Sequence, residues 1–142
     1  MVFNYNFKVA SKSEIEANIE DLVAIDTHYF IEEGWTRDAF LSEIEGKFEN
    51  SLLLFDDGKV IGYSIMSKRD YGYHWHKLVL HHDYTAQGLG KKFFNELMKK
   101  LAKEKITLKV DITNINTVIY HLKNGALFVD KSGQYYTMAY NG

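Results

Sequence analysis

The chain has 142 residues, of which 46% are hydrophobic and 25% charged, so it has the composition of a globular protein and the length of one domain. Its net charge of −2 gives no basic field, and it has no cysteine for disulfides, a thiolate nucleophile or a zinc–thiolate cluster, so we expect neither a nucleic-acid partner nor a metal site. No segment approaches the length of a membrane span and the N-terminus lacks the apolar core of a signal peptide, so we expect no membrane association and a cytoplasmic location.

The first fifty residues are predicted to form one strand and two helices. Residues 2–9 alternate loosely between apolar and polar side chains, which favours a strand. A first helix begins after Ser11, where Glu14 completes a capping box, and fades near Thr27. Thr36 caps a second helix.

The rest of the chain alternates strands with two further helices. Strands are predicted at residues 51–55, 60–68, 73–80, 106–112, 127–130 and 134–140. One helix carries the apolar stripe that begins at Leu89, and another begins at Asn114 and ends at Gly125. The predicted order is therefore β-α-α-β-β-β-α-β-α-β-β. The fourth and fifth strands should run parallel, because a helix joins them.

A glycine-containing loop lies between the fourth predicted strand and the helix that follows it. The six residues of this loop are Thr85, Ala86, Gln87, Gly88, Leu89 and Gly90. Glycine lets the backbone approach a ligand closely, and the free N–H groups at a helix N-terminus attract anions, so the loop is suited to a phosphate. Lys91 could add a positive charge at the same place. An ordinary helix start with permissive turn residues is the alternative interpretation.

The loop resembles the acetyl-CoA-binding segment of the GCN5-related N-acetyltransferases, the GNAT family. The family signature is Arg/Gln-x-x-Gly-x-Gly/Ala after a strand. Gly88 and Gly90 match its two small positions, whereas Thr85 stands where Arg or Gln is usual. The resemblance implies acetyl-CoA as the cofactor, with its pyrophosphate held largely by backbone amides of the loop.

A second match to the same family lies further along the chain. GNAT proteins often carry a pattern like N-x-x-A-x-x-x-Y-x-x-x-G-F. Counted back from Gly125, Asn114 falls on the Asn and His121 on the Tyr position, while Tyr120 is one residue out of register. Ala126 stands where Phe is usual. Two motifs at the right separation are more specific than either alone.

The resemblance covers nearly the whole chain and implies a fold and a reaction. The fold is α/β (α+β), a single GNAT domain with a mixed, mostly antiparallel sheet flanked by helices, in which the fourth and fifth strands splay apart. The reaction is direct attack of a primary amine, small or peptidyl, on the thioester of acetyl-CoA. A non-catalytic acyl-CoA-binding module of the same fold is the alternative, and a phosphate-binding protein unrelated to CoA is a third. A homodimer is left open.

The resemblance also assigns roles to individual residues. A backbone N–H of Leu80 or His81 would polarise the thioester carbonyl. Asn114 would bind the pantetheine amides and is also the predicted helix cap. His121 would give a proton to the leaving thiolate, with Tyr120 as its alternative.

A histidine is the expected general base, because its pKa lies near working pH. His74 stands where N-terminal-amine acetyltransferases of the family carry an acidic base, and His76, His81 and His82 compete with it. Strand alternation places His74 and His76 on the same face. For each of these histidines, an ordinary surface or hydrogen-bonded role is the alternative.

The amine acceptor is expected beside the first two helices. The resemblance places Tyr29, Glu32, Glu33 and Trp35 in the acceptor wall, and acidic groups beside an aromatic ring would suit a cationic amine. The alternative is that Trp35 packs against the second helix and the glutamates are solvated.

Overall fold

The computed structural model of the protein describes residues 5–30, 34–85, 88–101 and 103–142. Its strands are β1 (Tyr5–Val9), β2 (Leu52–Asp56), β3 (Lys59–Arg69), β4 (Gly72–Leu80), β5 (Lys105–Asp111), β6 (Leu127–Ser132) and β7 (Tyr135–Tyr140). Its helices are α1 (Lys12–Ala17), α2 (Ile19–Tyr29), α3 (Arg37–Leu41), α4 (Lys47–Asn50), α5 (Leu89–Lys100) and α6 (Ile115–Lys123), with a short 3₁₀ turn, η1 (His82–Tyr84). None of the helices in these described ranges is long and apolar enough to cross a membrane.

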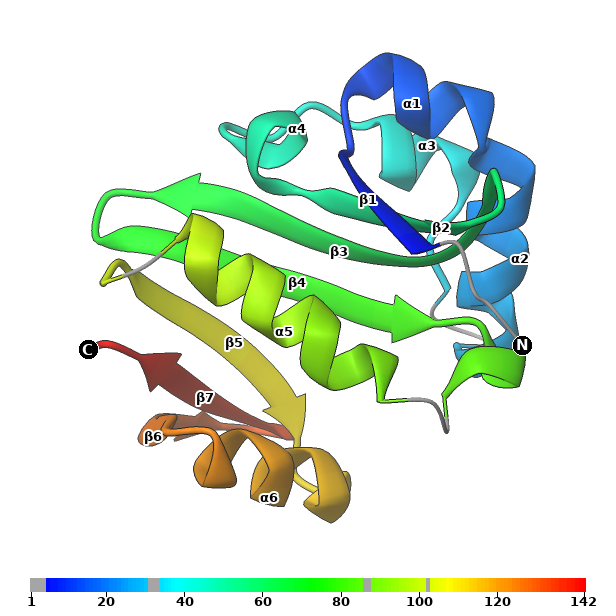
Figure 1. The fold of residues 1–142 in the computed structure, drawn as a ribbon. Helices are drawn as coiled ribbons and strands as arrows, with labels where there is room; N and C mark the ends of the chain where they lie inside the picture. The colour runs from blue at the N-terminus through cyan, green and yellow to red at the C-terminus, as the bar shows by residue number, and fades with distance from the viewer. Residues whose placement is uncertain (1–4, 31–33, 86–87, 102) are drawn as a thin grey trace.

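The described strands form one sheet in the order β1-β2-β3-β4-β5-β7-β6 (Figure 1). Every neighbouring pair is antiparallel except β4 and β5, which run parallel because α5 crosses over between them. The predicted mixed, mostly antiparallel sheet is therefore confirmed, as is the parallel pairing of its fourth and fifth strands.

Helices cover both faces of this sheet (Figure 1). α5 and α6 pack on one face, where Phe93 and Val118 belong to a single apolar cluster. α1, α2 and α3 pack on the other face, around Leu22 and Phe40. The residues of β2 are divided between the two clusters in alternation. A strand buried on both faces carries an unbroken apolar run, which is why residues 52–55 are all hydrophobic.

The N-terminal helical region is more divided than the sequence predicted. The first predicted helix is broken at Asn18, whose side-chain amide donates to Glu14 O (2.9 Å) and whose backbone leaves the helical region. The short α4 was not predicted. Both predicted caps are confirmed, because the hydroxyls of Ser11 and Thr36 accept backbone N–H groups three residues later.

The caps of α6 also agree with the sequence. The Thr117 N–H donates to Asn114 Oδ1 (3.4 Å) at its start. At its end Gly125 has a left-handed backbone (φ +102°), and the Ala126 N–H donates to His121 O (3.0 Å), which is the Schellman arrangement. The cap fixes the end of α6 and the turn into β6.

β4 contains a β-bulge opposite β3, and beyond it β4 and β5 are no longer paired. β3 pairs Met66 with Trp75 and Ile65 with Lys77, so His76 is the extra residue of the bulge. The pairing of β4 with β5 ends at Trp75 as well, although both strands continue. Because a bulge increases local twist, β4 turns away from β5 at this point. The predicted splay of the two strands thus begins at His76.

β6 forms one edge of the sheet and is exposed on both faces. Its apolar residues Leu127, Phe128 and Val129 are 68%, 52% and 57% exposed. Ile115 and Ile119, on the outer side of the neighbouring α6, are exposed too. This end of the molecule therefore presents an apolar surface to solvent.

Candidate active site

A cleft of about 780 Å³ opens where β4 and β5 separate. Seven of the predicted site residues line it, namely Tyr29, Leu80, Thr85, Gly90, Asn114, Tyr120 and His121. The other lining residues are Phe30, 75–79, 108–111, Thr117 and Tyr135. The cleft thus runs along both separated strands and reaches the N-terminal ends of α5 and α6.

The N-terminus of α5 forms one end of this cleft. Gly88 caps the helix in a left-handed conformation (φ +71°), which a side chain would strain. The N–H groups of the first helical turn have no acceptor within the helix. A Cβ on Gly90 would meet only Leu80 Cδ1, at 3.9 Å, so glycine keeps this part of the cleft open. The arrangement can bind an anionic group such as a phosphate.

The two candidate polarising amides differ in their partners. The His81 N–H donates to Ile61 O (2.7 Å) and is already bonded within the sheet. Hydrogen-bonded and non-hydrogen-bonded pairs alternate along an antiparallel ladder, so the N–H of Leu80, opposite Gly62, points away from β3 and toward the cleft. Of the two, the Leu80 amide is the one that can reach a carbonyl in the cleft.

Tyr120 and His121 both reach the cleft, but their surroundings differ. His121 is buried, its Nδ1 lies 2.6 Å from the Tyr140 hydroxyl, and burial lowers its pKa to about 4. Its imidazole is therefore neutral at neutral pH. Tyr120 is 36% exposed, and partial burial raises the pKa of its hydroxyl, which keeps its proton.

His74 and His76 lie side by side, with ring centroids 4.9 Å apart, so the prediction that they share a face is confirmed. The His74 Nδ1 lies 2.8 Å from Thr107 Oγ1, where β4 and β5 are still paired, and His74 is outside the cleft lining. His76 lines the cleft at the bulge, and its Nε2 lies 2.7 Å from Ser67 Oγ. Burial, with the charges of His74, Arg69 and Lys47, lowers the pKa of His76 to about 4.

A buried carboxylate organises the side of the cleft that is lined by Tyr29, Phe30 and Lys77. Asp26 on α2 is fully buried and accepts hydrogen bonds from the Tyr63 hydroxyl, from Lys77 Nζ (2.7 Å) and from the Trp35 N–H (2.5 Å). Lys77 Nζ lies 4.2 Å from the ring centroid of Phe30 and 5.1 Å from that of Trp35. These contacts hold the end of α2 and the segment at Trp35 against β4.

The predicted acceptor residues are thus placed unequally. Tyr29 lines the cleft, whereas Trp35 packs edge-on against Phe40 (5.4 Å) and is held by Asp26 behind the cleft wall. This position agrees with the alternative interpretation of Trp35 as a packing residue. Glu32, Glu33, Ala86 and Gln87 lie outside the described residues.

Comparison with known proteins identifies the family. Residues 17–126 match the model of the acetyltransferase (GNAT) family. The chain belongs to the GNAT family. A search of the curated proteins finds no significant match.

Solved structures of GNAT proteins resemble this fold at low sequence identity. The PaiA N-acetyltransferase of Thermoplasma acidophilum, in complex with coenzyme A, has a TM-score of 0.73 at 16% identity, with 96% of this chain and 98% of that chain covered. The ribosomal-protein-S18-alanine N-acetyltransferase of Escherichia coli has a TM-score of 0.77 at 18% identity, with 96% and 92% covered. An Arabidopsis thaliana protein in complex with the bisubstrate analogue CoA-Ac-MVNAL has a TM-score of 0.70 at 16% identity, with 96% and 97% covered.

Several residues and contacts around the cleft were not predicted from the sequence. Asp26 and Lys77 were overlooked, although an acidic residue four positions after Leu22, on the buried stripe of a helix, is itself a sign of a buried partner. The pairing of Tyr140 with His121 joins residues 19 apart and left no local signal. Of the remaining predicted residues, Leu89 is buried in the core and Lys91 is exposed on α5.

Proposed function

We propose that the protein is an acetyl-CoA-dependent N-acetyltransferase that transfers the acetyl group to a primary amine by direct attack. The observation that carries this proposal is the open gap between β4 and β5, which leads to the N-terminus of α5. Strand edges on both sides of the gap offer amide and carbonyl groups to an extended ligand arm, and the helix end offers N–H groups to its phosphates. Coenzyme A has this shape, with an amide-bearing arm joined to a pyrophosphate.

The polar groups of the cleft fit the parts of this ligand. Backbone N–H groups of Gly88 and Gly90 would contact the pyrophosphate, and Asn114 the pantetheine amides. The Leu80 N–H, which points away from β3, would stabilise the thioester oxygen, on which negative charge develops during attack. The hydroxyl of Tyr120 is the favoured proton donor to the leaving thiolate, since it keeps its proton and lines the cleft.

His76 is favoured as the proton acceptor over His74. It lines the cleft at the point where the strands separate, whereas His74 lies outside the cleft lining. The pKa of His76, lowered to about 4, leaves it unprotonated at neutral pH and also makes it a weaker base than an ordinary histidine. A direct transfer or a transfer through one water molecule would both suit its position. The amine itself would approach from the side of Tyr29 and Phe30.

Ligand binding and turnover test the proposal separately. Thermal unfolding with acetyl-CoA, CoA and ATP should show stabilisation by both CoA species and none by ATP. A screen of small amines and N-terminal peptides, read by release of free thiol, should then show turnover for some acceptor. Equal stabilisation by ATP would contradict CoA binding. Selective CoA binding without thiol release from any amine would favour the non-catalytic module, for which the departures at Thr85 and Ala126 are the sequence argument.

A further inference from the structure

A second cavity, of about 200 Å³, lies between α2, the start of β3 and η1. Histidines from two separate elements line it: His28 comes from α2, whereas His81 and His82 lie at the start of η1. The ring centroids of His28 and His82 are 4.2 Å apart, and those of His82 and His81 are 4.3 Å apart. Three imidazoles thus stack at one place.

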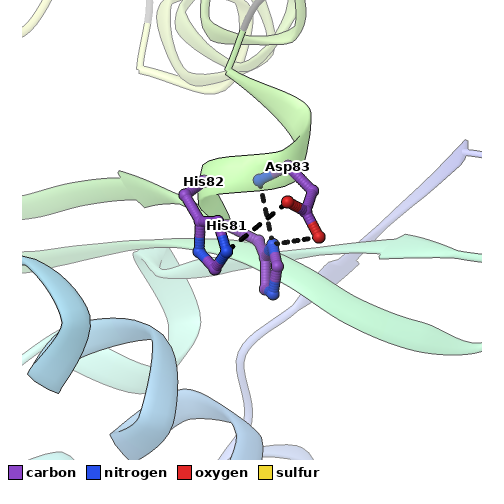
Figure 2. A group of neighbouring side chains, drawn as sticks. All are labelled: His81, His82 and Asp83. Atoms are coloured by element: carbon purple, nitrogen blue, oxygen red, sulfur yellow. Dashed lines mark hydrogen bonds and ion pairs between the residues drawn. The ribbon is translucent and has the colours of Figure 1, made fainter.

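The carboxylate of Asp83 joins this group, as Figure 2 shows. One of its oxygens, Oδ1, lies 3.4 Å from His82 Nε2, and the other, Oδ2, lies 3.8 Å from His81 Nδ1. One ligand atom from each of the three residues lies within 4.8 Å of the other two. Ligand atoms of a tetrahedral ion with bonds of about 2.0–2.2 Å are roughly 3.3–3.6 Å apart. Side-chain rotations that move the three ligand atoms by a few tenths of an ångström to about one ångström would therefore let all three reach the same ion.

The hydrogen bond to His81 identifies which of its nitrogens carries no proton. The Asp83 N–H donates to His81 Nδ1 (3.1 Å), so Nδ1 carries the lone pair and Nε2 carries the proton of the neutral ring. A metal ion at this point would exchange one long backbone hydrogen bond for a metal–nitrogen bond.

From this arrangement we infer that His81, His82 and Asp83 form a binding site for a divalent transition-metal ion, distinct from the acetyl-transfer cleft. Imidazole nitrogens with one carboxylate favour ions such as Zn²⁺ over Mg²⁺ or Ca²⁺, which prefer oxygen ligands. His28 is not one of the three ligands. It packs its ring on His82 and orients it, as outer residues do around metal sites.

The position of the site gives the ion a structural role. The Thr85 hydroxyl donates to His82 O (3.2 Å), so the turn that would hold the ion is continuous with the start of the glycine loop. An ion bound there would fix η1 and, through the His82–His28 stack, tie it to α2. From the sequence, His81 and His82 were candidate bases, the His81 N–H was also a candidate donor to the thioester carbonyl, and no metal site was predicted.

Direct binding measurements on the untagged, EDTA-treated chain test this inference. Titration calorimetry with Zn²⁺ should show one ion per chain, Mg²⁺ should not bind, and Zn²⁺ should raise the unfolding temperature. Asp83→Asn and His82→Phe should each weaken Zn²⁺ binding at least about tenfold. His82→Phe keeps the aromatic stack with His28 and removes only the nitrogens.

The matched control is His28→Phe, which keeps the same stack from the other side and should change Zn²⁺ affinity less than about threefold. A thermal unfolding curve of every variant in EDTA checks that each is folded before the titration. Absence of Zn²⁺ binding to the parent, equal binding of Mg²⁺, or equal Zn²⁺ affinity in the parent and Asp83→Asn would each overturn the inference. So would loss of binding in His28→Phe but not in His82→Phe.

Discussion

Tyr120 and His121 are neighbours on α6, yet they hold their protons differently. The Tyr120 hydroxyl is partly exposed to the cleft, whereas His121 is buried against Trp75 and Tyr140. A proton donor must hold its proton until the thiolate leaves, and a neutral imidazole bonded to a neighbouring hydroxyl is a weak acid. The environment of each ring therefore favours Tyr120 as the donor.

Removing each donor in turn tests this assignment. Tyr120→Phe should lower kcat by ~10²-fold with little change in acetyl-CoA affinity, because the interaction would form mainly in the transition state. His121→Phe, which keeps most of the ring volume, should affect kcat far less and should reduce stability through the lost contact with Tyr140. Steady-state rates and calorimetric CoA binding decide between them. The reverse ranking would assign the role to His121.

The pH dependence of the rate tests the general base. A base must be unprotonated, and the pKa of His76, lowered to about 4, leaves it unprotonated throughout the range of about pH 6–8. A rise in kcat/KM over that range would then report deprotonation of the amine substrate. His76→Ala should lower kcat/KM by ~10²-fold without moving this rise.

His74→Ala is the control for that experiment, because His74 has the same side chain on the same strand face and lies outside the cleft lining. It should keep most of the parent rate. An acidic limb that disappears in His74→Ala would instead identify His74 as the base; it would lie below the ordinary pKa of a histidine, because burial lowers the pKa of His74.

At the scale of elements, Asp26 on α2 pairs with Lys77 on β4 and so joins the two elements beside the cleft. Asp26→Asn should destabilise the protein by about 3–5 kcal/mol, because it leaves the ammonium of Lys77 buried without its partner. Urea unfolding measures this loss. The double variant Asp26→Asn, Lys77→Met removes both charges and should recover part of it; no recovery would mean that the ion pair is not the source of the effect.

The junction of β4 with α5 gives a prediction for the cofactor. Gly90→Glu should weaken acetyl-CoA binding by more than about 30-fold, roughly 2 kcal/mol, because a carboxylate would stand where the pyrophosphate is expected. The fold should survive, since the nearest atom to a Cβ here is Leu80 Cδ1 at 3.9 Å. Gly90→Ala adds the Cβ alone and is the control, with a much smaller loss. Unchanged CoA affinity in a folded Gly90→Glu variant would contradict the assignment.

For the whole molecule, the exposed edge formed by β6 predicts self-association. An edge strand with apolar side chains on both faces can pair with a second copy of itself. Light scattering should show a dimer, and Val129→Lys should convert it to a monomer. Val9→Lys places the same charge on β1, the opposite edge strand, and should leave the dimer intact. A monomeric parent at high concentration would refute this prediction.

The elements predicted well are those whose cause is local. Alternation gave the strands, and caps at Ser11, Thr36, Asn114 and Gly125 gave helix ends, because each cap depends on residues within a few positions. The bonded state of the His81 amide, the loss of His74 from the cleft and the Asp26–Lys77 pair depend on contacts between distant segments, which a local pattern does not contain. The order of the helices and strands was therefore more predictable than the roles of the individual histidines.

The bulge at His76 also determines which face of β4 carries the apolar side chains. Before it, Trp75 faces α5, and after it the α5-facing positions are Leu78 and Leu80 rather than the odd-numbered ones, so Lys77 faces Asp26. Without the bulge, a regularly pleated strand that kept His76 would turn Lys77 into the apolar cluster under α5. The bulge at which β4 separates from β5 thus also keeps the apolar residues of the strand facing α5 and Lys77 facing Asp26 on α2.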